Sequence, residues 1–138
     1  IIGPPWATIS AIDLNKGELV WQTVHGETDD AVKNHPALKG VTIPRTGRPG
    51  RIGVLTTKSL VMAGDAGMAT HPNGQRSGMF RAYDKKTGKE LGAVPLPGPQ
   101  TGSPMTYMHE GKQYIVVAVA GQGAAAELIG LALPDAPK

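Results

Sequence analysis

Three arginines spaced three residues apart are the side chains of this sequence best suited to binding an anion. Arg45, Arg48 and Arg51 lie in a connection that is rich in Pro and Gly. A guanidinium group binds a carboxylate through two parallel hydrogen bonds, and it can also donate to the hydroxyls of a sugar. Arg51 is the best candidate for such a contact, and solvated loop charge is the alternative for all three.

Side chains that could hold a metal ion are scattered along the chain. Four histidines show no ligand spacing, and each is predicted to be a surface histidine: His25, His35, His71 and His109. Of these, His71 is the one that could contact a substrate. Asp29 and Asp30 are adjacent, but the residues around them lack the alternating oxygen ligands of a calcium loop. A solvated turn is the preferred interpretation, and we expect no metal site.

Two further features could belong to a binding site. Gly121-Gln122-Gly123 resembles an anion cradle, yet no helix is predicted after it and no Lys-Ser/Thr pair accompanies it, so the sequence does not favour a phosphate loop. Trp6 follows two prolines and could either form the wall of a site or dock one sheet onto another.

The composition favours a single all-β domain. The chain has 138 residues with 19 Gly and 12 Pro, which indicates many turns rather than long helices, and it has no Cys for disulfides or thiolate metal sites. Its net charge of +3 comes from scattered Lys and Arg, so we expect no nucleic-acid binding. No apolar run is long enough for a membrane span, and no signal peptide is visible. The chain starts in mid-pattern without Met, and we expect an upstream portion.

A repeated Ala-x-Asp-x-x-x-Gly pattern predicts the elements that position these residues. It begins at Ala11 and again at Ala82, and apolar strands flank both copies. In such a hairpin Asp accepts backbone N–H bonds across the turn and Gly takes a positive φ. Trp21 closes the first copy and could dock onto the neighbouring sheet, whereas Gly92 stands at the equivalent place in the second copy. Repeated units of this kind stack on one another.

The strands predicted around these hairpins form units of four. Residues 1–25 would supply the last two strands of one unit, residues 51–94 one complete unit, and residues 103–134 three strands of a final unit. Nine strands are expected, at residues 8–12, 18–24, 52–56, 59–63, 79–83, 89–94, 104–108, 113–120 and 127–133. The run 114–120 is apolar at every position, which predicts a strand buried on both faces.

Four-stranded antiparallel units arranged around an axis make a β-propeller, and this chain would supply about two and a quarter blades. It should therefore belong to a longer propeller, or close by association with other chains. The parity of antiparallel strands gathers the long loops on one rim, where a site is most often found. That rim would carry Trp6 and the segments 46–51, 65–78, 95–102 and 121–123.

An ordered series of motifs resembles the C-terminal propeller segment of the PQQ-dependent (quinoprotein) dehydrogenases, and most closely the glucose dehydrogenase-like members. The hairpin frame ending at Trp21 is similar to the tryptophan-docking motif of that family. The other matching stretches are Pro4-Pro5-Trp6, Phe80-Arg81-Ala82-Tyr83-Asp84, Ser103-Pro104-Met105-Thr106-Tyr107, Gly111-Lys112-Gln113-Tyr114 and Leu131-Ala132-Leu133-Pro134-Asp135.

This resemblance implies an eight-bladed parent propeller that carries pyrroloquinoline quinone (PQQ) and Ca²⁺. The parent would oxidise a sugar or alcohol hydroxyl, pass electrons to a quinone or cytochrome acceptor, and work in the periplasm or after secretion. The family's general base and calcium ligands lie upstream, so no catalytic residue is assigned here and the segment alone should be inactive. Arg51 and Gln122 are the expected cofactor contacts, the latter in place of a His, and Trp6 and His71 would lie at the substrate rim.

The same resemblance suggests how the chain is completed. The last blade of the family receives a strand from the N-terminal part of the chain, so the partners expected here are the remaining blades, or other copies through open strand edges. The alternative from another functional class is a propeller scaffold or binding module without a cofactor.

Overall fold

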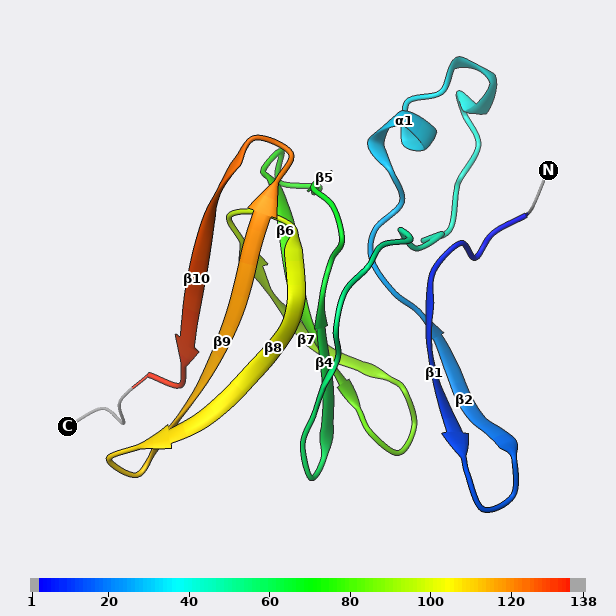
Figure 1. Cartoon of the computed structure of the whole chain (residues 1–138). Helices are drawn as coiled ribbons and strands as arrows, with labels where there is room; N and C mark the ends of the chain where they lie inside the picture. Colours follow the sequence, from blue (N-terminus) through cyan, green and yellow to red (C-terminus); the bar gives the residue numbers. More distant parts are fainter. Residues whose placement is uncertain (1–2, 135–138) are drawn as a thin grey trace.

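The computed structural model describes residues 3–134, and this part of the chain is nearly all-β (Figure 1). The strands are β1 (Thr8–Asp13), β2 (Glu18–Val24), β3 (Leu55–Thr56), β4 (Leu60–Gly64), β5 (Ala69–Thr70), β6 (Arg76–Asp84), β7 (Glu90–Leu96), β8 (Gln100–His109), β9 (Lys112–Gly121) and β10 (Ala124–Ala132). One turn of α-helix, α1 (Asp30–Lys33), and one 3-10 turn, η1 (Pro36–Leu38), follow β2.

The strands form three antiparallel groups that lie side by side (Figure 1). β1 pairs with β2; β3, β4, β6 and β7 pair in that order, with β5 beside the start of β6; and β8, β9 and β10 form the third sheet. The fold class expected from the sequence, an all-β partial propeller, is confirmed. The division into blade pieces at 1–25, 51–94 and 103–134 stays a prediction.

Both repeated hairpins close as their turn residues predict. The carboxylate Oδ1 of Asp13 accepts the backbone N–H groups of Asn15 and Lys16. In the second copy Asp84 Oδ1 accepts those of Lys86 and Thr87. The turn glycines Gly17 and Gly88 have φ of +70° and +71°, a backbone region that side chains with a Cβ rarely adopt.

The core lies between the four-stranded sheet and the β8–β10 sheet. Met62, Phe80 and Leu96 from the first sheet pack against Val117 and Val119 of β9. Full burial of each such side chain contributes about 1.5–3 kcal/mol. The opposite face of β9 is only half-buried, so the prediction of burial on both faces is wrong for the described residues. Tyr114, Val116, Ala118 and Ala120 on that face are all intermediate in exposure.

Three local predictions need correction. Residues 52–53 do not join β3, because Gly53 N–H donates to Gly102 O and Ile52 forms an isolated bridge with Gly102. β5 interrupts the predicted loop 65–78, since it is a two-residue strand in a polar sequence. Asp29 and Asp30 do not form a solvated turn, because Asp29 caps α1 through its side chain. Single helical turns leave no periodicity that a sequence could reveal.

One negative finding concerns membranes. The short helical turns between residues 3 and 134 include none with the length and apolar character that a membrane crossing requires.

Candidate functional site

The long connections of the chain gather at one edge of the sheets, at the top of Figure 1. This edge, called here the rim, holds α1, β5 and the β9–β10 turn (Figure 1). Strand directions explain this arrangement, because an even number of antiparallel strands returns the chain to the edge at which it entered, as in the β1–β2 hairpin and in the sheet of β3, β4, β6 and β7 (Figure 1). Arg51, His71 and Gln122 lie on these connections, and Trp6 directly precedes β1.

Three rim connections meet at the peptide groups of Met68. Gln122 Oε1 accepts the Met68 N–H at 3.0 Å, while Arg48 Nη1 donates to Met68 O at 2.8 Å. Arg48 also pairs with Asp29 through Nη2 at 2.8 Å. The guanidinium lies so close to Gly67 that a Cβ there would collide with it. We call this group of Arg48, Met68, Gln122 and Asp29 the Met68 junction.

Two of the three arginines have structural partners, so solvated loop charge is the wrong interpretation for them. Arg48 belongs to the Met68 junction. Arg45 pairs with Glu90 Oε2 and donates to Val24 O, both at 2.8 Å. Arg51 is exposed and has no hydrogen bond or ion pair to any other residue within 3–134. It is therefore the arginine that could meet a ligand at the rim.

His71 and Trp6, the two residues expected at the substrate rim, each make hydrogen bonds to neighbouring backbone groups. His71 is half-buried, with Nε2 3.3 Å from Ser77 O and its backbone N–H bonded to Gln75 O. Trp6 is 38% exposed, and its backbone N–H donates to Thr46 O at 2.7 Å. Among the described residues, no hydrogen bond or ion pair joins Arg51, His71 and Gln122 to one another.

A buried charge cluster beneath the rim went unrecognised in the sequence. Arg81 binds both carboxylate oxygens of Asp65 at 2.8 and 3.0 Å, and it also pairs with Glu27 and Glu90. Burial lowers the pKa of Arg81, but the hydrogen bonds and charge of Asp65, helped by Glu90 and Glu27, raise it above its usual range. Through these pairs Arg81 connects the residues that follow β2 to β6 and β7. The only sign of the cluster in the sequence is that a charged residue, Arg81, lies within the apolar strand predicted at 79–83.

His25 is buried at 3% exposure, so its predicted surface position is wrong. Its Nε2 lies 3.0 Å from Gly64 O and its Nδ1 2.8 Å from the Tyr83 hydroxyl. A carbonyl can only accept, so Nε2 carries the proton and Nδ1 accepts from Tyr83. Burial lowers the pKa of His25, which keeps the ring neutral, and burial also raises the pKa of Tyr83. The neutral His25 ring and the Tyr83 hydroxyl therefore form a stable link between the residues after β2 and the sheet that contains β4 and β6.

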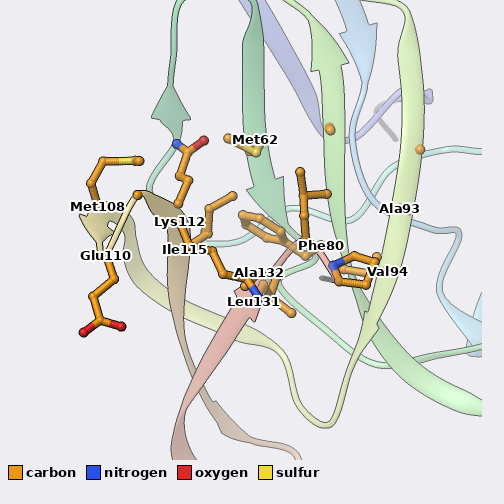
Figure 2. Close-up of a pocket in the computed structure, with 16 residues that line it drawn as sticks. Met62, Phe80, Ala93, Val94, Met108, Glu110, Lys112, Ile115, Leu131 and Ala132 are labelled. Carbon is orange, nitrogen blue, oxygen red and sulfur yellow. The ribbon is translucent and has the colours of Figure 1, made fainter. Parts of the chain in front are cut away.

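A pocket of about 1030 Å³ lies away from the rim, between β6–β7 and β9–β10 (Figure 2). Its walls are apolar, with Phe80, Val94, Ile115 and Leu131 around the gap in Figure 2. Glu110, in the β8–β9 turn at the edge opposite the rim, directs its carboxylate away from the gap (Figure 2). Lys112 and Gln113 also line the pocket, and its large apolar surface suits packing against protein.

Metal ligands do not converge in the part of the chain that the structure describes. No group of three or more His, Asp or Glu side chains there could hold a metal ion. The clustered carboxylates Asp65, Glu27 and Glu90 are instead occupied by Arg81.

The sheets define a segment of a β-propeller with its irregular loops gathered on one rim. Residues 1–115 match the family described as glucose/ethanol/alcohol dehydrogenase, beta-propeller domain, and the chain belongs to this PQQ family.

Individual relatives match along nearly the whole chain. Quinoprotein glucose dehydrogenase A of Acinetobacter calcoaceticus is 34% identical over 137 residues, which cover 96% of this chain and 16% of that protein. A quinoprotein glucose dehydrogenase of Gluconobacter oxydans is 33% identical over 138 residues, with the same coverage. The glycerol dehydrogenase large subunit of Gluconobacter thailandicus is 34% identical over 145 residues, covering 98% of this chain and 18% of that subunit. The chain thus spans less than a fifth of the length of these relatives.

Proposed function

We propose that the chain is the C-terminal propeller segment of a PQQ-dependent dehydrogenase that oxidises a sugar or alcohol hydroxyl. The observation that carries this proposal is the family match over residues 1–115, with relatives named glucose and glycerol dehydrogenases. Electrons would pass to a quinone or cytochrome acceptor, and the parent would work in the periplasm or after secretion.

The rim offers donors that fit a cofactor rich in carboxylate and carbonyl oxygens. The Arg51 guanidinium and the Gln122 Nε2 have no partner within residues 3–134. Both groups only donate, and they would hold acceptor oxygens of PQQ. PQQ supplies the redox chemistry when it is bound, while the protein binds and orients it. Ca²⁺ would be held by other blades, since the acidic side chains near the rim are already paired.

Trp6 and His71 are proposed to contact the substrate at the rim. Trp6 offers an exposed indole on which a sugar or alcohol could pack, and the other ring nitrogen of His71, Nδ1, has no partner among the described residues. Neither residue is assigned a catalytic role.

The remaining blades are proposed to complete the sheets at both sides of the segment. The side of β10 away from β9 has no strand partner in the described residues, and the apolar pocket opens beside it. Within the segment, Trp21 would act as a tryptophan-docking residue between the β1–β2 hairpin and the next sheet. Its Nε1 donates to Lys85 O at 3.0 Å, and its ring covers Gly88 of the next sheet. Expressed alone, the segment should associate through its open edges.

Reconstitution of the full-length protein with PQQ and Ca²⁺, followed by dye reduction, tests the proposed function. We expect reduction with glucose or a simple alcohol as the electron donor. The isolated 138 residues serve as a control and should give no turnover, because the general base would lie in other blades. A full-length protein that takes up no PQQ and reduces no dye would instead be a propeller scaffold.

A further inference from the structure

The connection between β2 and β3 contains a long stretch in which no residue is buried. Every residue from 29 to 44, including those of the turns α1 and η1, is exposed or half-buried. None of its apolar side chains belongs to the core between the two larger sheets. A segment that buries so little apolar surface opens at a lower free energy than the sheets around it. We call residues 29–44 the α1 loop.

The two ends of the α1 loop meet at a buried pair of threonines. Thr28 is 3% exposed and Thr46 1%, and Thr28 Oγ1 accepts the Thr46 N–H at 3.0 Å. Directly after this pair, a Cβ on Gly47 would lie 2.5 Å from Ala7 O, so backbone packs closely against backbone there. A compact loop whose ends are held together is an Ω-loop, and such loops often have a functional role. The base of the α1 loop is therefore fixed.

The body of the α1 loop is bonded to β5 through polar side chains. The carboxylate of Asp30 accepts the Thr70 N–H at 3.0 Å and the Thr70 hydroxyl at 2.9 Å, and Lys33 Nζ donates to Thr70 O at 3.3 Å. Both Thr70 and Lys33 are exposed, so water competes for these contacts. Asp30 and Thr70 thus form a latch, and its release uncovers no part of the apolar core.

A second polar attachment lies beside this latch. Asp29 Oδ1 accepts the Ala31 N–H at the start of α1, while Asp29 Oδ2 pairs with Arg48 at 2.8 Å. Arg48 in turn donates to Met68 O, two residues before Thr70. Both attachments leave from the first residues of the α1 loop and reach the same short segment, 68–70. A movement that breaks one attachment should therefore weaken the other.

The α1 loop lies at the rim. Figure 1 shows it beyond the ends of the strands, on the same side of the sheets as β5 and the β9–β10 turn. Arg51 follows the loop in the same connection. Movement of the loop away from β5 would therefore widen the approach to the rim.

We propose that the α1 loop is a hinged lid, which turns about the Thr28–Thr46 pair and opens the rim to ligands when Asp30 leaves Thr70. The latch makes no contact with the ligand. Its release should therefore speed both entry and departure of the ligand and leave the affinity unchanged. The gating part of this inference rests on the proposed function, whereas the hinge and the latch do not.

The first part of the test uses hydrogen exchange of the full-length protein without cofactor. The Thr70 amide reports the latch, and the Thr46 amide reports the hinge. Asp29→Asn keeps the side-chain acceptor that caps α1 but loses the charge that binds Arg48. It should speed exchange at Thr70 about threefold and leave Thr46 unchanged. No hydrogen bond joins Asp29 to Thr70 within residues 3–134, so the loop itself must transmit this effect.

Glu110→Gln removes an exposed carboxylate at the opposite edge and is the matched control, with no change expected at either amide. Unchanged exchange at Thr70 in Asp29→Asn would overturn the lid, because the two attachments would then be independent. Equal acceleration at Thr46 would overturn the hinge, because the whole connection would then unfold.

The second part measures the rates of PQQ association and dissociation in the presence of Ca²⁺. Asp30→Ala removes the latch and should make both rates about fivefold faster, with the same equilibrium affinity as wild type. Glu110→Gln should behave as wild type. Unchanged rates in Asp30→Ala would overturn the gate, and so would a weaker affinity with an unchanged association rate, which would make Asp30 a ligand contact. If the wild type binds no PQQ, the proposed function and the gate both fail, and exchange at Thr70 and Thr46 still decides the lid.

Discussion

At the scale of single residues, buried polar side chains determine how the loops join the sheets. His25 and Arg81 both lie beneath the rim, and each bonds to groups far away in the sequence. A buried side chain of this kind is satisfied only in one protonation state and one arrangement of partners. pH and substitution at these positions should therefore affect stability more than at exposed residues of the same type.

The neutral state of His25 predicts loss of stability in acid. Burial lowers the pKa of His25 below the ordinary value of 6.5, so the unfolded chain binds the proton more readily than the folded chain. Its contribution is complete above pH 6.5 and is lost as the pH falls below that value. The charged groups around the ring are Asp65, Arg81 and Arg45.

The measurement is the thermal midpoint of the full-length protein at about pH 7.5 and about pH 5.5. His25→Gln can keep both hydrogen bonds without titrating, so its midpoint should fall less in acid than that of wild type. His109→Gln changes an exposed histidine and should behave as wild type. Equal acid sensitivity of all three proteins would contradict the neutral, buried state of His25.

Arg81→Met should destabilise the full-length protein by about 3–5 kcal/mol, because it leaves Asp65, at 1% side-chain exposure, without its charge partner. Arg76→Met is the comparison. Arg76 is 51% exposed and lies 3.9 Å from Asp30, so its loss should cost less than about 1 kcal/mol. Urea unfolding monitored by tryptophan fluorescence gives both values. Similar losses in the two variants would mean that the Arg81 cluster adds nothing beyond a surface pair.

At the scale of elements, local chemistry made the hairpins predictable and long-range pairing made other parts unpredictable. Asp13, Asp84 and their turn glycines act within a few residues, so their pattern is visible in the sequence. By contrast, Ile52 and Gly53 pair with Gly102, about fifty positions further along the chain, and no local pattern could predict this pairing. The burial of His25 likewise depends on Tyr83 and Gly64, which no local pattern announces.

The candidate site shows the same division. Loop composition and strand parity predicted which segments reach the rim, and Arg51 and Gln122 are found there as exposed side chains. The spacing of the three arginines could not show that Arg48 pairs with Asp29 and Arg45 with Glu90. These ion pairs depend on how the connection 25–50 folds.

The contact between neighbouring sheets can be tested by two glycine substitutions of equal backbone strain. Gly88→Ala places a Cβ 2.5 Å from Cε3 of Trp21, whereas Gly17→Ala meets no atom within 4 Å, and their φ angles are nearly the same. Both variants should lose about 1 kcal/mol to the positive φ, and Gly88→Ala should lose a further 1–3 kcal/mol or so to the collision. Unfolding midpoints of the full-length variants measure the difference. Equal losses would show that the Trp21 contact does not stabilise the protein.

At the scale of the whole molecule, the described residues have the form of an arc with two incomplete sides. The hairpin of β1 and β2 leaves Leu19 and Val20 exposed at one side, and Leu128 of β10 is 75% exposed at the other. Exposed apolar strands and open edges are liabilities that a closed ring removes. The rim runs across this arc, so a ligand at the axis of the complete propeller would meet several of its loops together.

Hydrogen exchange of the Ca²⁺-loaded, full-length protein, measured with and without PQQ, shows which edge of the sheets holds the cofactor. If the rim holds PQQ, exchange should slow on PQQ binding in residues 65–70 and 121–123 and should not change in the turns 14–17 and 85–88 at the opposite edge. Protection at the opposite edge, or at neither edge, would contradict a cofactor held at the rim.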